Sequence, residues 1–436
     1  MRQHYLDAVQ RAPLVERQGK VAAIAGYSVE AIGPDVTLGE VCEIVPLDAP
    51  PLPAEAVGLH GGRVVLMPYG ELRGVGIGDR VRATGRQAGM PVGPALLGRV
   101  IDAFGQPLDG GPPPQAAEHR PLQAPPINPL TRPRIGEVLP TGVRAIDTLL
   151  PLGRGQRIGI FAGSGVGKST LLGMLARDVQ ADINVIALIG ERGREVREFV
   201  EKHLGPEGLQ RSVVVVATSD QPALARTRAT QAATVIAEYF RDQGRQVLLM
   251  MDSITRFAMA RREIGLAAGE PPTARGYTPS VFADIPALCE RCGTAESGGS
   301  ITALYTVLVE GDDFNEPISD IVRATLDGHV MLSRELAHEG HFPAIDVLQS
   351  TSRLAGDLAS AEELAVMGSA VEQLATYQRN RQMVDMGAYR AGSNPAIDRA
   401  MQVYPGLRAV LCQSVHESTP RAEAMARLQR ALGEAP

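Results

Sequence analysis

Short apolar runs separated by glycine and proline fill the chain between Lys20 and about Gly85. Runs this brief and closely spaced are typical of the strands of a small barrel or sandwich. The residues before them, 1–19, are expected to form a short helix or a flexible segment. Strands are predicted at 21–24, 27–32, 38–45, 54–59, 63–67 and 80–84.

The pattern changes after a connector whose nine prolines, between residues 107 and 133, exclude a continuous helix or strand. Beyond Gly136, apolar strand-like runs alternate with amphipathic helical runs, which predicts a parallel sheet covered on both faces. After about Gly356 the apolar positions, such as Met367 and Leu374, recur at helical spacing, so this part is predicted to be helical. The predicted strands are 157–161, 183–189, 212–218, 246–251, 301–309 and a short run near 330; the predicted helices are 168–177, 195–203, 222–241 and 254–264.

Composition limits the possible functions. The chain has 436 residues, 44% hydrophobic and 21% charged, as in an ordinary soluble globular protein, and its net charge of −6 disfavours a broad nucleic-acid surface. No apolar run approaches the ~18 residues that span a bilayer, and the first residues lack a signal core. We therefore expect a cytoplasmic protein. Cys289 and Cys292 form a CxxC without a second ligand pair, so we interpret them as buried or incidental thiols.

A glycine-rich loop between the predicted strand 157–161 and the next helix points to nucleotide chemistry. Closely spaced glycines let backbone N–H groups point at phosphate oxygens, and the helix adds the positive end of its dipole. Lys168 is predicted to reach the outer phosphates and Ser169 to hold Mg²⁺. The loop predicts a nucleoside triphosphate site rather than a turn without ligand. Its residues are Ala162, Gly163, Ser164, Gly165, Val166, Gly167, Lys168 and Ser169, followed by Thr170.

Two carboxylates follow other predicted strands. Asp252 ends the apolar run 247–251, and Glu191 follows the run 185–189. Because the carboxyl ends of parallel strands line the ligand crevice, Asp252 is expected to support Mg²⁺ through water and Glu191 to polarise the attacking water. The alternative for Glu191 is a solvated charge cluster that opens a helix. The strand-end position favours the catalytic interpretation.

Five segments carry a family resemblance: AGSGVGKSTLL (162–172), IGERGREVREF (189–199), MDSITRFA (251–258), GEPPTARGYTPSVFA (269–283) and HFPAIDVLQSTSR (341–353). The chain resembles the type III secretion and flagellar export ATPases, which are relatives of the catalytic β subunit of rotary ATP synthases. The resemblance spans about Lys20 to the C-terminus. It implies ATP and Mg²⁺ as ligands, with Lys168, Ser169, Glu191 and Asp252 in the roles given above.

The resemblance implies further site residues. Arg192 matches a phosphate contact, and Arg256 matches an arginine directed at the γ-phosphate. Arg353 matches the arginine that family hexamers insert into the neighbouring subunit's site, where such a finger is worth ~10³ to 10⁵ in rate. Phe342 stands where the family usually has a tyrosine packed on the base, and its alternative is a core aromatic. Tyr389 is a candidate for the other side of the base.

By resemblance, the fold is a multidomain α/β protein: a small N-terminal β-barrel, a central RecA-like P-loop NTPase domain with a mainly parallel sheet, and a C-terminal helical domain. The expected boundaries are 1–19 for a stator-contacting segment, 20–95, 96–360 and 361–436. The implied assembly is a homohexamer at the cytoplasmic face of the inner membrane, attached through partners. Those partners are a stator protein, a central stalk protein, an export gate and chaperone–substrate complexes, with no nucleic acid.

Several alternatives stay open. The strings at 217–222, 236–244 and 305–313 favour the injectisome branch over the flagellar branch. An ATP synthase β subunit would carry an acidic C-terminal segment that this chain lacks. A ring-shaped RNA helicase would need stacking aromatics in its N-terminal domain, where only Tyr27 and Tyr69 occur between residues 20 and 85. A non-catalytic ring subunit would lack the carboxylate that Glu191 supplies.

Overall fold

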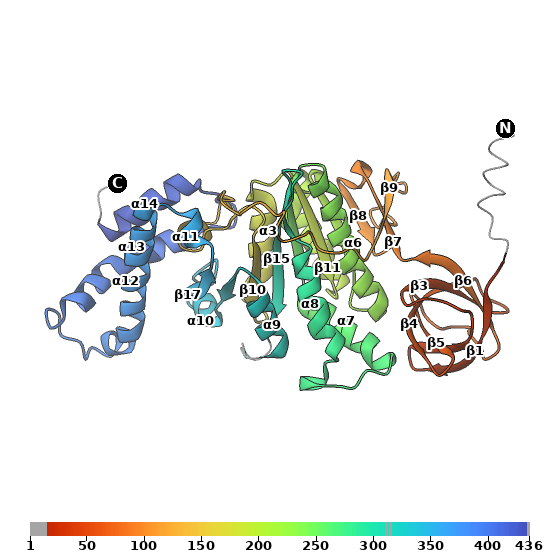
Figure 1. The fold of residues 1–436 in the computed structure, drawn as a ribbon. Helices are drawn as coiled ribbons and strands as arrows, with labels where there is room; N and C mark the ends of the chain where they lie inside the picture. Colours follow the sequence, from red (N-terminus) through yellow and green to blue (C-terminus); the bar gives the residue numbers. More distant parts are fainter. Residues whose placement is uncertain (1–14, 310–312, 314–315, 434–436) are drawn as a thin grey trace. The chain divides into compact units, whose positions relative to one another are not determined.

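The computed structural model describes residues 15–309, 313 and 316–433. They form two compact units (Figure 1). One unit contains residues 15–89, 221–227 and 259–281, and the other contains the remaining described residues. Most of the predicted N-terminal segment, residues 1–14, lies outside the described residues. None of the helices in the described part of the chain combines the length and apolar character needed to cross a bilayer.

The first unit contains a closed antiparallel barrel of six strands in the order β1-β2-β5-β4-β3-β6. Buried and half-buried residues alternate along β3, with Cys42 and Ile44 fully buried, because one face of each strand lines the barrel interior. All six strands predicted from the sequence are confirmed. They are β1 (Gln18–Ala25), β2 (Ser28–Ile32), β3 (Glu40–Val45), β4 (Leu52–His60), β5 (Arg63–Pro68) and β6 (Arg80–Gln87).

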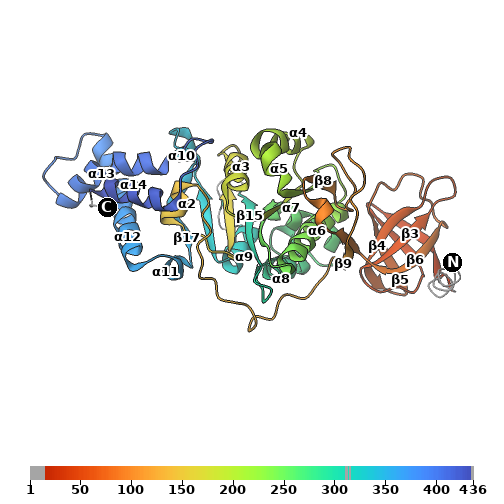
Figure 2. The same ribbon diagram turned by 90° about the horizontal axis from the view of Figure 1, so that it is seen from above.

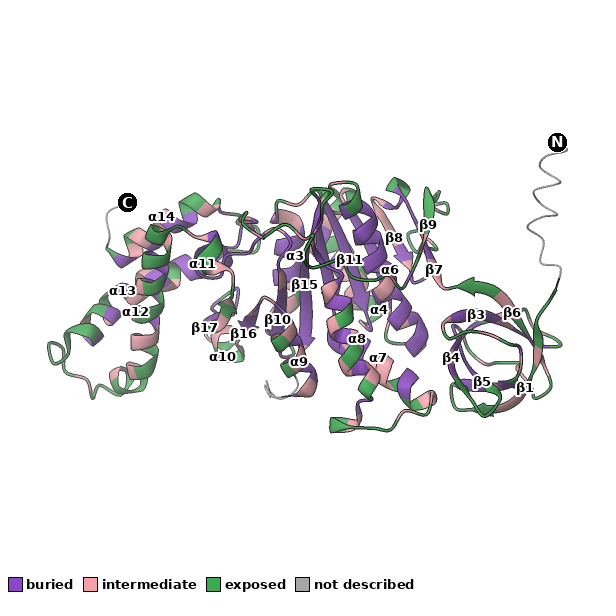
Figure 3. Cartoon of the chain, viewed as in Figure 1, coloured by how far each residue is buried: buried purple, intermediate pink, exposed green. Residues whose placement is uncertain are grey.

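A mainly parallel sheet forms the centre of the second unit, in the order β17-β16-β10-β15-β13-β11-β12-β8. Along this order only β16 and β17 pair in antiparallel fashion. Every residue of β11 and β12 is buried (Figure 3), which explains their continuous apolar sequences. The strands are β8 (Arg99–Asp102), β10 (Arg157–Ala162), β11 (Ile183–Ile189), β12 (Ser212–Ala217), β13 (Gln246–Asp252), β15 (Ser300–Leu308), β16 (Gly328–Leu332) and β17 (Ile345–Ser352). The short β14 (Gly293–Thr294) pairs with β15, and β7 (Gly89–Val92) pairs with β9 (Glu118–Pro121) inside the proline-rich connector.

Helices cover both faces of this sheet. Figure 2 shows α3 (Lys168–Asp178), α4 (Gly193–Glu198) and α5 (Gly205–Gln210) on one side, and α9 (Pro317–Thr325) with most of α8 (Pro279–Glu290) on the other. The predicted helix 195–203 is divided between α4 and the π-helical segment η2 (Phe199–Leu204). The other helices before the C-terminal part include α2 (Arg144–Leu149), α6 (Ala223–Asp242), α7 (Ile254–Ala267), α10 (Arg334–His338) and α11 (Ala355–Leu358), of which α6 and α7 each contribute residues to both units.

The C-terminal part is helical, as predicted. It contains α12 (Ala361–Asp385), α13 (Pro395–Leu411) and α14 (Arg421–Leu432). A reciprocal capping box between Ser360 and Glu363 fixes the start of α12. Along this helix Met367 and Leu374 are buried. The predicted arrangement of barrel, mainly parallel sheet and helical C-terminal part is therefore confirmed.

Candidate active site

The glycine-rich loop joins the end of β10 to the start of α3. Gly165 and Gly167 have φ angles of +80° and +91°, a backbone conformation that side chains rarely allow. Gly167 is the N-cap of α3, whose first N–H groups have no partner within the helix. The loop and the helix therefore present backbone donors to one space, the geometry that phosphate binding requires.

The Lys168 side chain lies between two carboxylates. Its Nζ atom donates a hydrogen bond to Asp252 Oδ1 and lies 3.3 Å from Glu191 Oε1. The side chains are only 11%, 7% and 16% exposed, respectively. The parallel pairing of Leu188 with Asp252 brings both carboxylates to the same edge of the sheet. The structure thus assembles three predicted site residues into one buried charge cluster.

Burial and charge act against each other in this cluster. Burial lowers the pKa of the Lys168 ammonium, but the charges of Asp252 and Glu191 outweigh it, so the pKa is raised and the lysine stays protonated. Burial raises the pKa of the Glu191 carboxyl; Lys168 opposes the rise, a hydrogen bond with Glu195 adds to it, and the pKa stays above its ordinary value. A carboxylate with a raised pKa is a better proton acceptor, as a general base requires.

Thr306 on β15 is a site residue that sequence reasoning missed. Its hydroxyl is fully buried and donates a 2.7 Å hydrogen bond to Asp252 Oδ1. Lys168 and Thr306 therefore both bond the same oxygen of Asp252. The sequence signal for Thr306 is a polar residue near the end of the apolar strand β15. This strand pairs with β13, whose last residue is Asp252.

Replacing Thr306 by valine should weaken the binding of Mg²⁺. The fold should be preserved, because the two side chains have the same shape. A hydrogen bond to a charged group contributes about 1.5–3 kcal/mol, so we expect the Mg²⁺ concentration for half-maximal ATPase activity to rise about tenfold or more. Thr302→Val is the matched control, since Thr302 accepts from Gly155 N instead. Equal magnesium titrations for both variants would contradict the role of Thr306.

The two arginines predicted from the family resemblance, Arg256 and Arg192, differ in their surroundings. A Cβ atom added to Gly190 would meet the Arg256 side chain at 2.9 Å, so Arg256 packs directly against the residue before Glu191. Arg192 is exposed at the N-cap of α4, where its Nη1 lies 3.8 Å from Glu195 Oε1. Arg256 therefore lines the catalytic edge, while Arg192 projects toward solvent.

A pocket of about 200 Å³ adjoins the phosphate loop. Phe342 lines it, and its ring lies 3.8 Å from the position that a Cβ atom of Gly167 would occupy. Gln413 and Val415, which follow α13, also line this pocket and were not assigned to the base from the sequence. This pocket has the place and the apolar character of a nucleobase site.

The structure does not bring Tyr389 to this pocket. Its hydroxyl donates to Asn394 O and to Asp398 Oδ1, both at 3.0 Å. These bonds fix Tyr389 in the turn between α12 and α13, whereas Gln413 and Val415 line the pocket together with Phe342.

Arg353 lies at the other edge of the sheet. Ser352, at the end of β17, pairs with Gly328 at the start of β16, whereas Ile345 at the start of β17 pairs with Leu332 beside the loop edge. Gly328 and Leu332 are four residues apart on β16, so at about 3.3 Å per residue the two ends of β17 lie roughly 13 Å apart. Arg353 is exposed and its Nη2 donates to Arg323 O. Arg353 therefore lies at the opposite end of β17 from the strand end beside the phosphate loop.

The two cysteines of the CxxC are buried thiols. Cys289 and Cys292 are fully buried, and Cys292 Sγ lies 3.2 Å from the Tyr305 hydroxyl. Burial raises the pKa of both, to about 11 for Cys292, so they stay protonated and unreactive. Within residues 15–433, excluding the undescribed gaps, no cluster of three or more His, Cys, Asp or Glu could hold a metal by itself.

Comparisons with known proteins agree with this geometry. Models of the ATP synthase alpha/beta family match residues 21–85 (β-barrel domain) and 142–352 (nucleotide-binding domain), and the T3SS EscN ATPase C-terminal domain matches residues 359–430. The flagellum-specific ATP synthase of Bacillus subtilis is 52% identical over 99% of both chains, and the type 3 secretion system ATPase of Xanthomonas euvesicatoria is 51% identical over 92% of both. The structure of the assembled ATPase EscN from enteropathogenic E. coli superimposes with a TM-score of 0.91 at 44% identity, covering 95% of this chain and all of that one.

Proposed function

Because the chain belongs to the family of type III secretion and flagellar export ATPases, we propose that it hydrolyses Mg·ATP in a homohexameric ring and thereby powers protein export. In this role it releases secreted substrates from their chaperones and unfolds them for the export gate. The observation that carries the proposal is the cluster of Lys168, Glu191 and Asp252 at the phosphate-loop edge, with Arg353 exposed at the other edge.

Each group has a chemical role in this proposal. The loop and Lys168 hold the phosphates, while the Ser169 hydroxyl and Asp252 would hold Mg²⁺, whose charge would neutralise that of the phosphates. Magnesium commonly binds through one or two protein groups plus phosphates and water, so the absence of an acidic cage among the described residues is compatible with it. Glu191 orients and deprotonates the attacking water, and Arg256 faces the γ-phosphate.

The proposed setting follows from the relatives. One solved structure is that of assembled EscN in complex with its central stalk EscO, matched at a TM-score of 0.87 and 43% identity. By analogy, this chain would contact a central stalk protein, and residues 1–19 a stator protein. The ring would work at the cytoplasmic face of the inner membrane, held there by its partners.

Replacing Glu191 by glutamine in the native cells should stop export and should lower the ATPase rate of the purified protein by about 10²-fold or more. Glu198→Gln is the matched control, because Glu198 lies exposed on α4 and pairs with Lys202. Normal export by the Glu191 variant would overturn the coupling of hydrolysis to export. ATPase loss in both variants would point to a folding defect instead.

Flagellar export is the second candidate. Relatives named flagellum-specific ATP synthase reach 52% identity, as high as the type 3 secretion ATPases. The sequence strings at 217–222 and 236–244 favour the injectisome. Deletion of the gene distinguishes the two, since loss of motility would assign the protein to the flagellum and loss of effector secretion with intact motility would assign it to the injectisome.

A further inference from the structure

The strand that leads to Arg353 pairs irregularly with β16. On β17, the paired residues Thr351 and Asp346 enclose four residues, 347–350, whereas their partners on β16 enclose only Val330. Such a bulge bends the strand and interrupts its hydrogen-bond ladder. The position of Arg353 therefore depends on the few contacts that lie beyond the bulge.

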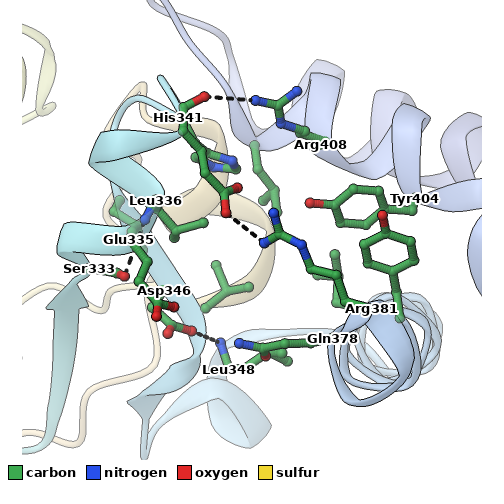
Figure 4. Close-up of a pocket in the computed structure, with 16 residues that line it drawn as sticks. Ser333, Glu335, Leu336, His341, Asp346, Leu348, Gln378, Arg381, Tyr404 and Arg408 are labelled. Carbon is green, nitrogen blue, oxygen red and sulfur yellow. Dashed lines mark hydrogen bonds and ion pairs between the residues drawn. The ribbon is translucent and has the colours of Figure 1, made fainter. Parts of the chain in front are cut away.

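Side chains replace backbone pairing inside the bulge. Asp346 Oδ1 accepts from Leu348 N at 3.0 Å (Figure 4). Ser350 Oγ accepts from Met331 N at 2.9 Å and donates to Asp346 O at 2.6 Å. These bonds fix the bulge and the start of β17, so the last residues of the strand need other contacts.

Asp327, in the turn between α9 and β16, supplies such a contact. Its carbonyl oxygen accepts from Arg353 N at 3.0 Å. Gln156 Nε2 bridges Asp327 O, at 3.3 Å, and Ser352 Oγ, at 3.2 Å. The Arg353 guanidinium donates from Nη2 to Arg323 O, 3.1 Å away in the last turn of α9. The backbone and the side chain of Arg353 are therefore both held by the segment that ends in Asp327.

Asp327 is itself clamped by Arg157, the first residue of β10. Arg157 Nε donates to Asp327 Oδ2 and Nη2 donates to Oδ1, both at 3.1 Å, while the backbone N of Arg157 donates to Oδ2 at 3.0 Å. The two side chains are 15% and 22% exposed. A bidentate pair fixes direction as well as distance. The clamp thus determines where the carbonyl that holds Arg353 lies.

We infer that Asp327, fixed by Arg157, is a positioning residue that aims Arg353 at the neighbouring subunit's nucleotide. The inference rests on the proposed function and deepens it, because it names what holds the arginine in place. A misplacement of about 1 Å can lower a rate by about 10²-fold. Asp327 bonds the first residue of β10, whereas the phosphate loop follows the last. Its loss should therefore leave nucleotide binding in its own subunit intact.

The first test is Asp327→Asn, which keeps the shape but turns an amide N–H₂ toward the Arg157 guanidinium. We expect kcat to fall by about 10- to 100-fold, less than in Arg353→Ala, with the Kd for ATP unchanged. Asp109→Asn is the matched control. Arg99 clamps Asp109 in the same bidentate way, at 2.7 Å, beside β8 at the other end of the strand order. The control should keep the wild-type kcat.

Mixed rings distinguish positioning from damage to the variant's own site. Combined with Lys168→Ala subunits, Asp327→Asn subunits receive an intact arginine from their neighbours, so turnover should rise above that of pure Asp327→Asn rings. Combined with Arg353→Ala subunits, they receive none, and turnover should fall. A merely structural defect would lower turnover in both mixtures.

Wild-type kcat in Asp327→Asn rings, or a fall of turnover in both mixtures, would overturn the inference and leave the proposed function standing. Wild-type kcat in Arg353→Ala rings would instead overturn the proposed role of Arg353, and the inference with it. If Asp327→Asn rings do not assemble, Arg157→Lys gives the same test, because lysine keeps the charge and loses the bidentate geometry.

Discussion

Replacing Arg353 by alanine should lower the maximal ATPase rate by about 10³-fold or more, while each subunit still binds nucleotide. An arginine that neutralises charge on the transferring phosphoryl group contributes ~10³ to 10⁵ in rate. Arg353 lies at the end of β17 that pairs with the start of β16, away from its own phosphate loop, and its side chain is exposed. The loss should therefore appear in kcat rather than in binding.

The measurement is steady-state turnover together with nucleotide affinity and ring assembly. Arg379→Ala is the matched control, because Arg379 is exposed on α12 and bonds only local groups, Ala375 O and Thr376 Oγ1. The control should keep the wild-type rate. Wild-type kcat in assembled Arg353→Ala rings would refute a catalytic role for this arginine.

Replacing Glu191 by glutamine should lower kcat by about 10² to 10⁴-fold, the usual contribution of a positioned general base. Glutamine keeps the shape and removes the negative charge beside Lys168, so Mg·ATP binding should persist. The same variant should lose the acid limb of the pH–rate profile. Burial raises the pKa of Glu191, so its proton returns at a higher pH than in a free glutamate, and the wild-type rate falls as the pH decreases through that raised value.

Profiles of kcat between about pH 5 and 8, where folded proteins tend to be most stable, check this prediction. Wild-type and Glu198→Gln proteins should share the acid limb, and the residual rate of Glu191→Gln should be flat there. An unchanged acid limb in the Glu191 variant would assign the titration to another group.

Strands that are buried on both faces, or on one face along their whole length, were predictable from the sequence. The sequences of β11, β12 and β13 are apolar because both faces of these strands are covered. In a barrel strand such as β3, buried and half-buried residues alternate because only one face lines the barrel interior. β17 escaped prediction because its first residues are buried and its second half alternates toward solvent, so that Ile345–Ser352 follows neither pattern. β8 has only four residues and precedes the proline-rich connector.

The clustering of the proposed catalytic residues was predictable because each follows a recognisable strand end or belongs to a motif. Lys168, Glu191 and Asp252 needed only the rule that parallel strands end at one edge. Thr306 and Gln413 needed the structure, since their roles depend on contacts with residues 54 and 271 positions away along the chain. For Tyr389 the sequence suggested a place beside the base. In the structure, hydrogen bonds to Asp398 and Asn394 hold its side chain in the turn between α12 and α13.

The central claim is that the phosphate loop of one subunit and Arg353 of its neighbour form one site, and mixing two inactive variants tests it most directly. Lys168→Ala and Arg353→Ala rings should each be inactive. In mixed rings, an Arg353→Ala subunit still holds nucleotide and a Lys168→Ala neighbour still supplies the arginine, so about a quarter of interfaces in an equal random mixture are complete. We predict partial recovery of turnover in such rings, and no recovery in well-formed mixed rings would contradict the account.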